Sequence, residues 1–152
     1  MSDIETVKQV RKLSQLYAYT SLQMHEAVAR KAGLSGTDHK YLGFLLEKGQ
    51  MTAGELATLT GLTTGAVTGL IDRFEKKGLV RRQFAPDDRR KVFIVPETDV
   101  ITALLEPLYR EFRHQHEALL ASFPANERAV LETYFRQAIG LMQQTTDQLN
   151  DN

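Results

Sequence analysis

Cysteine is absent from the 152-residue sequence. Its absence excludes disulfides, cysteine nucleophiles, thiol redox chemistry and cysteine-based zinc sites. Long hydrophobic runs are also missing, since no stretch of 18 apolar residues occurs, and we expect no membrane-spanning helix. The opening residues MSDIE lack the basic and apolar stretches of a secretory signal. We therefore expect a cytoplasmic protein without a membrane partner.

A net charge is lacking too, because 19 Lys and Arg balance 19 Asp and Glu. Neutrality alone argues against a nucleic-acid partner, but the charge is unevenly distributed. Residues 60–93 carry eight basic and four acidic side chains, a net +4, and the rest of the chain carries −4. Such asymmetry indicates an electropositive face on a neutral body, the alternative being chance clustering on a solvated surface.

Sequence motifs of common enzymes are missing as well. Neither the phosphate-binding pattern GxxxxGK[ST] nor the nucleophile elbow GxSxG occurs, and no set of acid–base or nucleophilic residues stands out. His114 and His116 suggest a metal site, but their i, i+2 spacing places the two imidazoles on different faces of a helix. Solvated or packed histidines are the favoured interpretation. We therefore predict a protein that is not an enzyme and holds no cofactor or metal.

At 42% hydrophobic and 25% charged residues, the composition is that of a globular protein, and the length favours a single domain over residues 1–152. Its two ends, residues 4–32 and 98–150, have the apolar periodicity of long helices. In the first, the apolar step is about 3.4 residues, close to that of a coiled-coil seam. Gly33 and Gly36 are expected to end this helix, and Pro107 to kink or interrupt the later one.

The middle of the chain changes in character. Residues 37–48 and a short helix opened by the capping box of Thr52 and Glu55 precede a helix that starts at Thr63 or Thr64 and runs to Lys77. Residues 79–84 and 91–95 then have the composition of two strands, joined by a turn-rich loop that carries Arg89 and Arg90. Helix, turn, helix and basic β-hairpin together predict a winged helix-turn-helix lobe over residues 37–96. The fold class is mainly α with a small β-hairpin wing.

This arrangement suits DNA, because the second helix of such a motif enters the major groove with its N-terminal end near the bases. Small residues there allow a close approach, threonines can contact phosphates or bases, and a wing arginine can enter a narrow minor groove. The spacing of Asp88 and Arg90 predicts that the two side chains pair. The candidate DNA-binding residues are Thr63, Thr64, Gly65, Ala66, Thr68, Gly69, Arg73, Arg82, Asp88, Arg89 and Arg90.

Three stretches carry a family resemblance: GELA at 54–57, VT followed by DRFEKKGLVRR between Val67 and Arg82, and DRR at 88–90. With them the chain resembles the MarR family of bacterial regulators. The resemblance implies a homodimer with a winged helix on each subunit, bound to a pseudo-palindromic site in double-stranded DNA. It also implies a small aromatic or phenolic effector in the cleft between the dimerisation helices and the DNA-binding lobe. Two positions depart from the family pattern: Pro96 follows the second wing strand, and Gly69 replaces a longer side chain.

The resemblance further assigns the long helices, 4–32 and 98–150, to dimerisation, and places Arg90, positioned by Asp88, in the minor groove. Arg89 and Arg82 would lie near phosphates. The seam is expected to include Val7, Val10, Leu13, Tyr17, Leu131, Phe135, Ala138, Met142 and Leu149. The effector-binding residues are not assigned: Tyr17, Tyr19, His39, Tyr41 and Tyr109 could line a pocket, although core packing is the favoured role for each.

The sequence thus predicts a DNA-binding transcriptional regulator, a repressor in preference to an activator, whose DNA affinity a small molecule controls. Two other classes stay open. One is an adaptor that uses its winged helix to dock on another protein, against which the exposed arginines of the wing argue. The other is a small-molecule-binding protein or enzyme with its site in the helical cleft.

Overall fold

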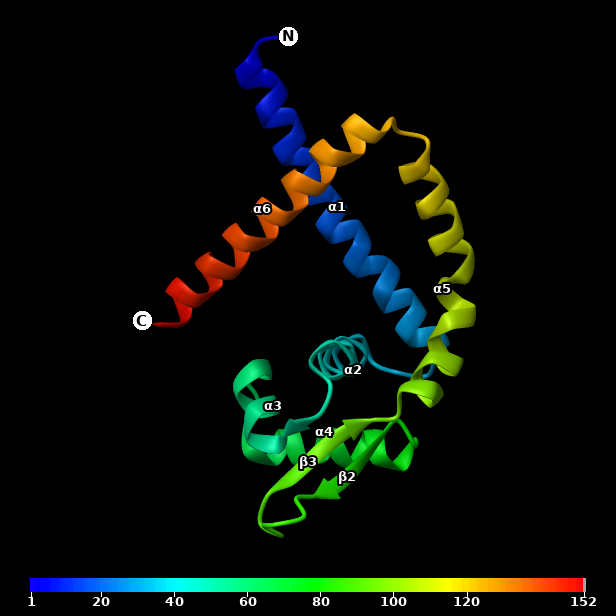
Figure 1. Ribbon diagram of the computed structural model, residues 1–152, viewed down its shortest axis with the longest axis vertical. Helices are drawn as coiled ribbons and strands as arrows, with labels where there is room; N and C mark the ends of the chain where they lie inside the picture. Colours follow the sequence, from blue (N-terminus) through cyan, green and yellow to red (C-terminus); the bar gives the residue numbers. More distant parts are fainter. Residues whose placement is uncertain (152) are drawn as a thin grey trace. The chain divides into compact units, whose positions relative to one another are not determined.

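The computed structural model describes residues 1–151. Within them the chain forms helices α1 (Asp3–Lys31), α2 (Gly36–Lys48), α3 (Ala53–Thr60), α4 (Thr64–Lys76), α5 (Thr98–Ala121) and α6 (Ala125–Asn150), with strands β1 (Met51–Thr52), β2 (Val80–Phe84) and β3 (Val92–Pro96) (Figure 1). The prediction of a mainly α fold with a small β-hairpin wing is confirmed.

The first helix boundary differs in one detail from the sequence-based expectation. α1 ends at Lys31, and Gly33 takes the left-handed conformation, with φ +76°, that glycine adopts at low cost. Gly36, however, begins α2 instead of ending α1. The reason is Ser35, whose hydroxyl accepts a hydrogen bond from the Asp38 N–H and so caps the helix before Thr37 is reached.

The helix-turn-helix of α3 and α4 is built from two N-terminal caps. At α3 the Thr52 hydroxyl accepts from the Glu55 N–H, at 3.1 Å, while the Glu55 carboxylate accepts from the Thr52 N–H. Gly61, in the left-handed conformation, then turns the chain. At α4 the Thr63 hydroxyl accepts from the Ala66 N–H. Both predicted caps are confirmed.

Replacing Thr52 by alanine removes the cap of α3 and is expected to lower the free energy of unfolding by about 1 kcal/mol. The cost is modest because water reaches the first-turn N–H groups once the hydroxyl is gone. Urea unfolding followed by circular dichroism measures it. Thr58→Ala is the matched control, since the Thr58 hydroxyl bonds only to the Gly54 carbonyl within the helix. An equal loss in both variants would contradict the role of the cap.

The sheet has the strand order β1-β3-β2, with both pairs antiparallel. β2 and β3 form the predicted hairpin, in which Arg82 lies opposite Ile94, and β2 packs beside α4 (Figure 1). On the other edge of β3, Met51 pairs with Ile94. Strand β1 was missed in the sequence because two residues are too few to show an alternating pattern. It fixes the start of α3 against the wing.

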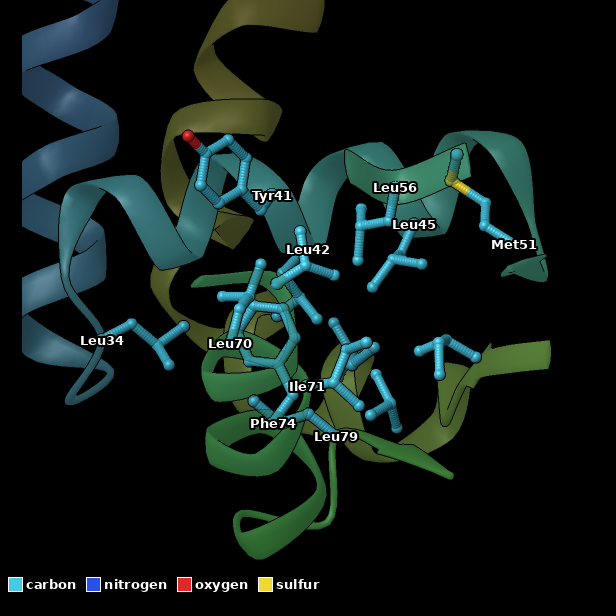
Figure 2. Packing of buried hydrophobic residues seen from close by; sticks show 14 of the residues in the cluster. Leu34, Tyr41, Leu42, Leu45, Met51, Leu56, Leu70, Ile71, Phe74 and Leu79 are labelled. Atoms are coloured by element: carbon cyan, nitrogen blue, oxygen red, sulfur yellow. The ribbon is translucent and has the colours of Figure 1, made fainter. Parts of the chain in front are cut away.

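The core of this lobe lies between α2 and α4. Leu70, Ile71 and Phe74 extend from α4 toward Leu42 and Leu45 of α2, and Leu56 of α3 closes one side (Figure 2). The inward face of α4 is fully packed, because Val67 and these three α4 residues are at most 2% exposed. Leu59, near the C-terminal end of α3, is 39% exposed.

The last two helices are longer than the helices in the middle of the chain. α5 runs without interruption through Pro107, so the expected interruption is not observed. Proline removes one N–H donor, and the bonds formed by the other residues of this 24-residue helix keep it continuous. α6 begins after Pro124, which is its N-cap and contributes no side-chain hydrogen bond. Arg128 donates to the Phe123 carbonyl and ties the start of α6 to the preceding turn.

Two compact units divide the chain. The first contains residues 1–109 and includes the winged lobe, α1 and the beginning of α5, while the second begins at Arg110 and includes the end of α5 and α6. Most of the core residues belong to the winged lobe. Over Ala125–Asn150, every residue of α6 is half-buried or exposed.

Candidate nucleic-acid interface

The N-terminal end of α4 is the surface that the sequence assigns to DNA. Its first N–H groups, at Thr64 and Gly65, precede the intrahelical hydrogen-bond pattern and can donate outward. Such N–H groups, together with the positive end of the helix dipole, hold phosphate well. Thr63, Thr64, Gly65, Ala66 and Thr68 are exposed, and Gly69 is half-buried. The helix therefore presents a shallow surface that a nucleic-acid backbone or base edge can approach.

The threonine hydroxyls on this face are partly engaged within the helix. The Thr68 hydroxyl donates to the Thr64 carbonyl at 3.0 Å, and the Thr63 hydroxyl accepts from the Ala66 N–H. Thr63 retains its O–H donor, and Thr68 retains its lone pairs and methyl group. These two hydroxyls therefore have fewer donors and acceptors free for a ligand than the sequence suggests.

Arg82 connects the wing to α4. From β2 its guanidinium donates to Glu75 at 2.6 Å and to Asp72 at 2.7 Å, both on α4. The hydrogen bond to Asp72 raises the pKa of Arg82, which is charged in any case. Its side chain is 31% exposed. The geometry makes Arg82 a brace that fixes the hairpin relative to α4.

Arg73 forms a second ion pair, with Asp38 on α2. Its Nε donates to Oδ2 at 3.0 Å and its Nη2 donates to Oδ1 at 2.9 Å, which makes the contact bidentate. The hydrogen bonds to Asp38 raise the pKa of Arg73. Sequence reasoning missed Asp38, because 35 residues separate it from Arg73 and no local pattern links them. The pair joins the outer side of α4 to the first turn of α2.

The tip of the wing is organised by Asp88. Its Oδ1 accepts from the backbone N–H of Arg90 at 2.9 Å and from the Arg90 Nε at 3.5 Å. An Asp that accepts from the N–H two residues later stabilises a tight turn. The predicted pairing of these side chains is confirmed, and the Arg90 side chain is 95% exposed. Arg89 is also exposed, so two guanidinium groups extend from one short loop.

A separate polar cluster lies between α1, α2 and α5. The Tyr109 hydroxyl bonds to His25 Nδ1 at 2.6 Å and to His39 Nε2 at 3.1 Å. The two imidazole rings stack with their centroids 5.8 Å apart. A cavity of about 390 Å³ adjoins them, lined by Leu22, His25, Glu26, Gly36, Thr37, His39, Lys40 and Gly43. Of the tyrosines considered as pocket residues, Tyr41 is buried in the core, and Tyr17 and Tyr19 are exposed on α1.

This cluster predicts a pH-dependent stability. Burial, and then the neighbouring His25, lower the pKa of His39 below its usual 6.5, so the unfolded chain binds more protons. The contribution of neutral His39 is present above about pH 6.5 and lost as the pH falls. His39→Gln is expected to weaken the decrease in Tm between about pH 7.5 and pH 5. Scanning calorimetry measures both slopes, with His116→Gln as the control, and equal slopes in wild type and His39→Gln would contradict the assignment.

Other kinds of site find no support in the part of the chain that the structure describes. Residues 1–151 contain no group of three His, Asp or Glu side chains placed to hold a metal ion, and His116 stacks on Phe112. In the same residues, no helix is sufficiently long and apolar to span a membrane. The candidate site therefore consists of the exposed arginines of the wing, Arg89 and Arg90, and the N-terminal end of α4.

Comparison with known proteins decides the family. A sequence model of the MarR family matches residues 32–91. The chain is 43% identical over 118 residues to the HTH-type transcriptional regulator YcgE of Bacillus subtilis, a match that spans 71% of this chain and 77% of the relative. It belongs to the MarR family.

Solved structures agree with this membership. A MarR family protein from Bacillus stearothermophilus superposes with a TM-score of 0.69 at 25% identity, over 94% of this chain and 99% of that one. A mutant MarR from E. coli, complexed with operator DNA, shares the fold, with a TM-score of 0.54 at 21% identity, over 91% and 99% of the two chains. As a MarR-family chain with these relatives, the protein is a helix-turn-helix transcriptional regulator and not an enzyme.

Its two departures from the MarR-family pattern have local structural consequences. Pro96 ends β3 opposite Val80, and the next residue, Glu97, donates its N–H to the Leu79 carbonyl. The Glu97 carboxylate also accepts from Arg81 at 2.9 Å, so the entry to α5 is well fixed. At the second departure, Gly69 provides the space next to the Arg73 guanidinium.

Proposed function

We propose that the protein binds a pseudo-palindromic operator in double-stranded DNA as a homodimer and represses transcription until a small-molecule effector weakens the complex. This role places it in the cytoplasm. The observation that carries the proposal is the lobe of residues 36–96, in which the exposed N-terminal end of α4 and the exposed Arg90 are fixed to one frame by Arg82. A rigid frame of this kind presents two contacts to one duplex.

The proposed DNA-contacting surface has two parts with different tasks. The N-terminal part of α4 enters the major groove with Thr63, Thr64, Gly65, Ala66, Thr68, Gly69 and Arg73. In the wing, Arg89 contacts a phosphate and Arg90 enters the minor groove. A narrow minor groove concentrates negative potential, which attracts the guanidinium. Asp88 and Arg82 act by positioning the wing, because the first orders its tip and the second braces its base.

Homodimerisation is supported by apolar side chains that the single chain leaves exposed. On α1, the exposed stripe contains Val7, Val10, Leu13 and Tyr17, which are 50–68% exposed. On α6, Phe135, Met142 and Leu149 are 44–70% exposed, and Leu131 and Ala138 of the same stripe are partly buried. Exposed apolar stripes of this length mark interaction surfaces. A second copy of the chain supplies the matching surface, and two lobes about 34–36 Å apart can then enter successive major grooves.

The cavity beside His25 and His39 is the proposed effector site. It combines apolar wall atoms with the two imidazoles and with Lys40, a set that suits a small aromatic or phenolic anion. α2 lines this cavity and also contacts α4 through Asp38, so a bound ligand is connected to the DNA-binding surface. In some dimers the spacing between the two lobes would not fit successive major grooves. An effector that binds these dimers more tightly would increase their population and so release the operator.

Selection of duplexes from a random-sequence pool with the full-length protein tests operator binding. The expected product is an inverted repeat whose half-sites lie one helical turn apart, protected as one footprint. Recovery of no preferred sequence would contradict the proposal and favour an adaptor. Transcription in vitro from a promoter that overlaps the selected site tests repression, where an increase in transcript would contradict it.

The effector site is tested by titrating 4-hydroxybenzoate and related aromatic carboxylates into the preformed complex. Release of DNA by wild type, together with loss of this response in His25→Ala, is the expected result. A matched control is His116→Ala, which removes an imidazole that stacks on Phe112 and does not line the cavity. Equal release from wild type and His25→Ala would contradict the placement of the site.

A further inference from the structure

The ion pair of Asp38 and Arg73 leaves one edge of the guanidinium available. Asp38 accepts from Nε and Nη2, which is the side-on edge, and its own side chain is only 13% exposed. The Arg73 side chain is 55% exposed. One N–H of Nη1 and the second N–H of Nη2 form the end-on edge of the plane, and within residues 1–151 no further hydrogen bond from Arg73 is observed. Two parallel donors of this kind match the O6 and N7 acceptors of guanine.

Gly69 leaves space beside this edge on the surface of α4. Side chains on a helix lean toward its N-terminus, so the guanidinium of residue 73 reaches the level of residue 69, one turn earlier. A Cβ added at Gly69 would lie 3.6 Å from the Arg73 Nη1, which is ordinary contact distance. The guanidinium therefore lies beside Gly69, next to the space that a longer side chain at position 69 would fill. It is thereby brought toward the end of α4 that faces the bases.

We propose that Asp38 is a positioning residue for DNA recognition, which holds Arg73 beside Gly69 so that Arg73 reads a guanine in each half-site of the operator. This inference rests on the proposed function. Arg73, in the third turn of α4, would make the base contact that Gly69 cannot make because it has no side chain.

Positioning matters because arginine is a flexible side chain. A free guanidinium loses much of its rotamer freedom when it binds a base, and this loss reduces affinity and specificity. A carboxylate that already fixes the plane removes part of that cost. Because Asp38 is shielded and paired, its negative charge is compensated where it would otherwise repel phosphate.

The first test compares base preferences of wild type, Asp38→Ala and Arg73→Ala, using the duplex pool described above. Arg73→Ala is expected to lower affinity for the selected duplex about 10- to 100-fold and to abolish the preference for guanine at one position per half-site. Asp38→Ala is expected to relax the same position, with a loss of about 3- to 10-fold. A loss of affinity that is the same for every base at each position, together with a weaker salt dependence, would show that Arg73 contacts phosphate. That result would overturn the proposal that Arg73 contacts a guanine.

Coupling between the two residues separates positioning from a structural role. In an Arg73→Ala background, Asp38→Ala is expected to cause no further loss of affinity. Asp38→Glu, which retains the carboxylate, is expected to recover part of the preference for guanine. Glu47→Ala is the matched control, since it removes the same charge from an exposed site on α2. Stronger binding by Asp38→Ala, or an equal loss in both backgrounds, would overturn the proposal.

A second variant leaves Asp38 unchanged, in case its removal destabilises α2. Gly69→Leu places a branched side chain against the Arg73 Nη1 and is expected to relax the same base position, whereas Gly69→Ala is tolerated at 3.6 Å and retains it. Unchanged base preference in Gly69→Leu would contradict the geometry. If wild type selects no sequence, the proposed function fails. If wild type selects a site but Asp38→Ala and Gly69→Leu retain its full preference, this inference alone fails.

Discussion

Arg90→Ala is expected to weaken binding to the operator about 100-fold while leaving Tm unchanged. The effect is large because each homodimer loses two wing arginines, each of which contributes about 1–1.5 kcal/mol. Stability is unaffected because the Arg90 side chain is 95% exposed and its one side-chain contact, to Asp88, is long at 3.5 Å. Fluorescence anisotropy with the selected duplex measures the affinity, and differential scanning calorimetry measures Tm.

Two controls show whether this loss comes from the wing tip. Arg136→Ala removes the same charge from α6, where Arg136 only pairs with Glu132 in the same helix, and binding is expected to change less than about threefold. Asp88→Ala leaves the Arg90 charge but removes the acceptor that orders the turn, so an intermediate loss is expected. Equal affinity of Arg90→Ala and wild type would show that the wing does not contact the duplex.

Replacing Met142 and Leu149 together by lysine is expected to convert the dimer into monomers and to abolish operator binding at concentrations where wild type binds fully. Both residues lie on the exposed apolar stripe of α6, where they are 62% and 70% exposed in the single chain. In a dimer they would become buried, and an unpaired buried charge is strongly unfavourable. Operator binding fails in turn because a single lobe loses the effective concentration that the partner lobe supplies. Light scattering is expected to give the 17.2 kDa of one chain instead of twice that mass.

The matched control for this variant places two lysines on the opposite side of the same helix. Gln137 and Gln144 have the same seven-residue spacing, and both are exposed. Gln137→Lys with Gln144→Lys is expected to remain dimeric and to bind the operator. A persistent dimer in the Met142 and Leu149 variant would show that another surface forms the interface.

The helical framework of this chain follows from short-range chemistry and was predictable for that reason. Thr52 and Glu55 form a capping box whose two partners lie three residues apart, and Asp88 and Arg90 interact across a single turn. The inward face of α4 has the period of a helix, so Leu70 and Phe74, four residues apart, are both buried. Each of these features depends on residues less than two helical turns apart.

What the sequence did not reveal depends on distant partners. Asp38 meets Arg73 only because α2 and α4 share a core, and Tyr109 meets His25 across 84 residues. The engagement of Arg82 by two carboxylates of α4 likewise depends on how β2 packs beside that helix. The missed strand β1 is a two-residue pairing with β3, and no periodicity marks it. These contacts are also the ones that connect the candidate effector cavity, α4 and the wing.

Operator recognition is tested by the salt dependence of binding to the selected duplex, compared with a scrambled duplex of equal length. We expect a preference for the selected duplex of at least about 1,000-fold at physiological salt, with log K falling at a slope of about −0.9 for each phosphate contacted. Equal, weak and salt-sensitive binding to both duplexes would mean that the basic face attracts DNA without recognising an operator. Absence of binding even at low salt would show that the protein does not bind DNA.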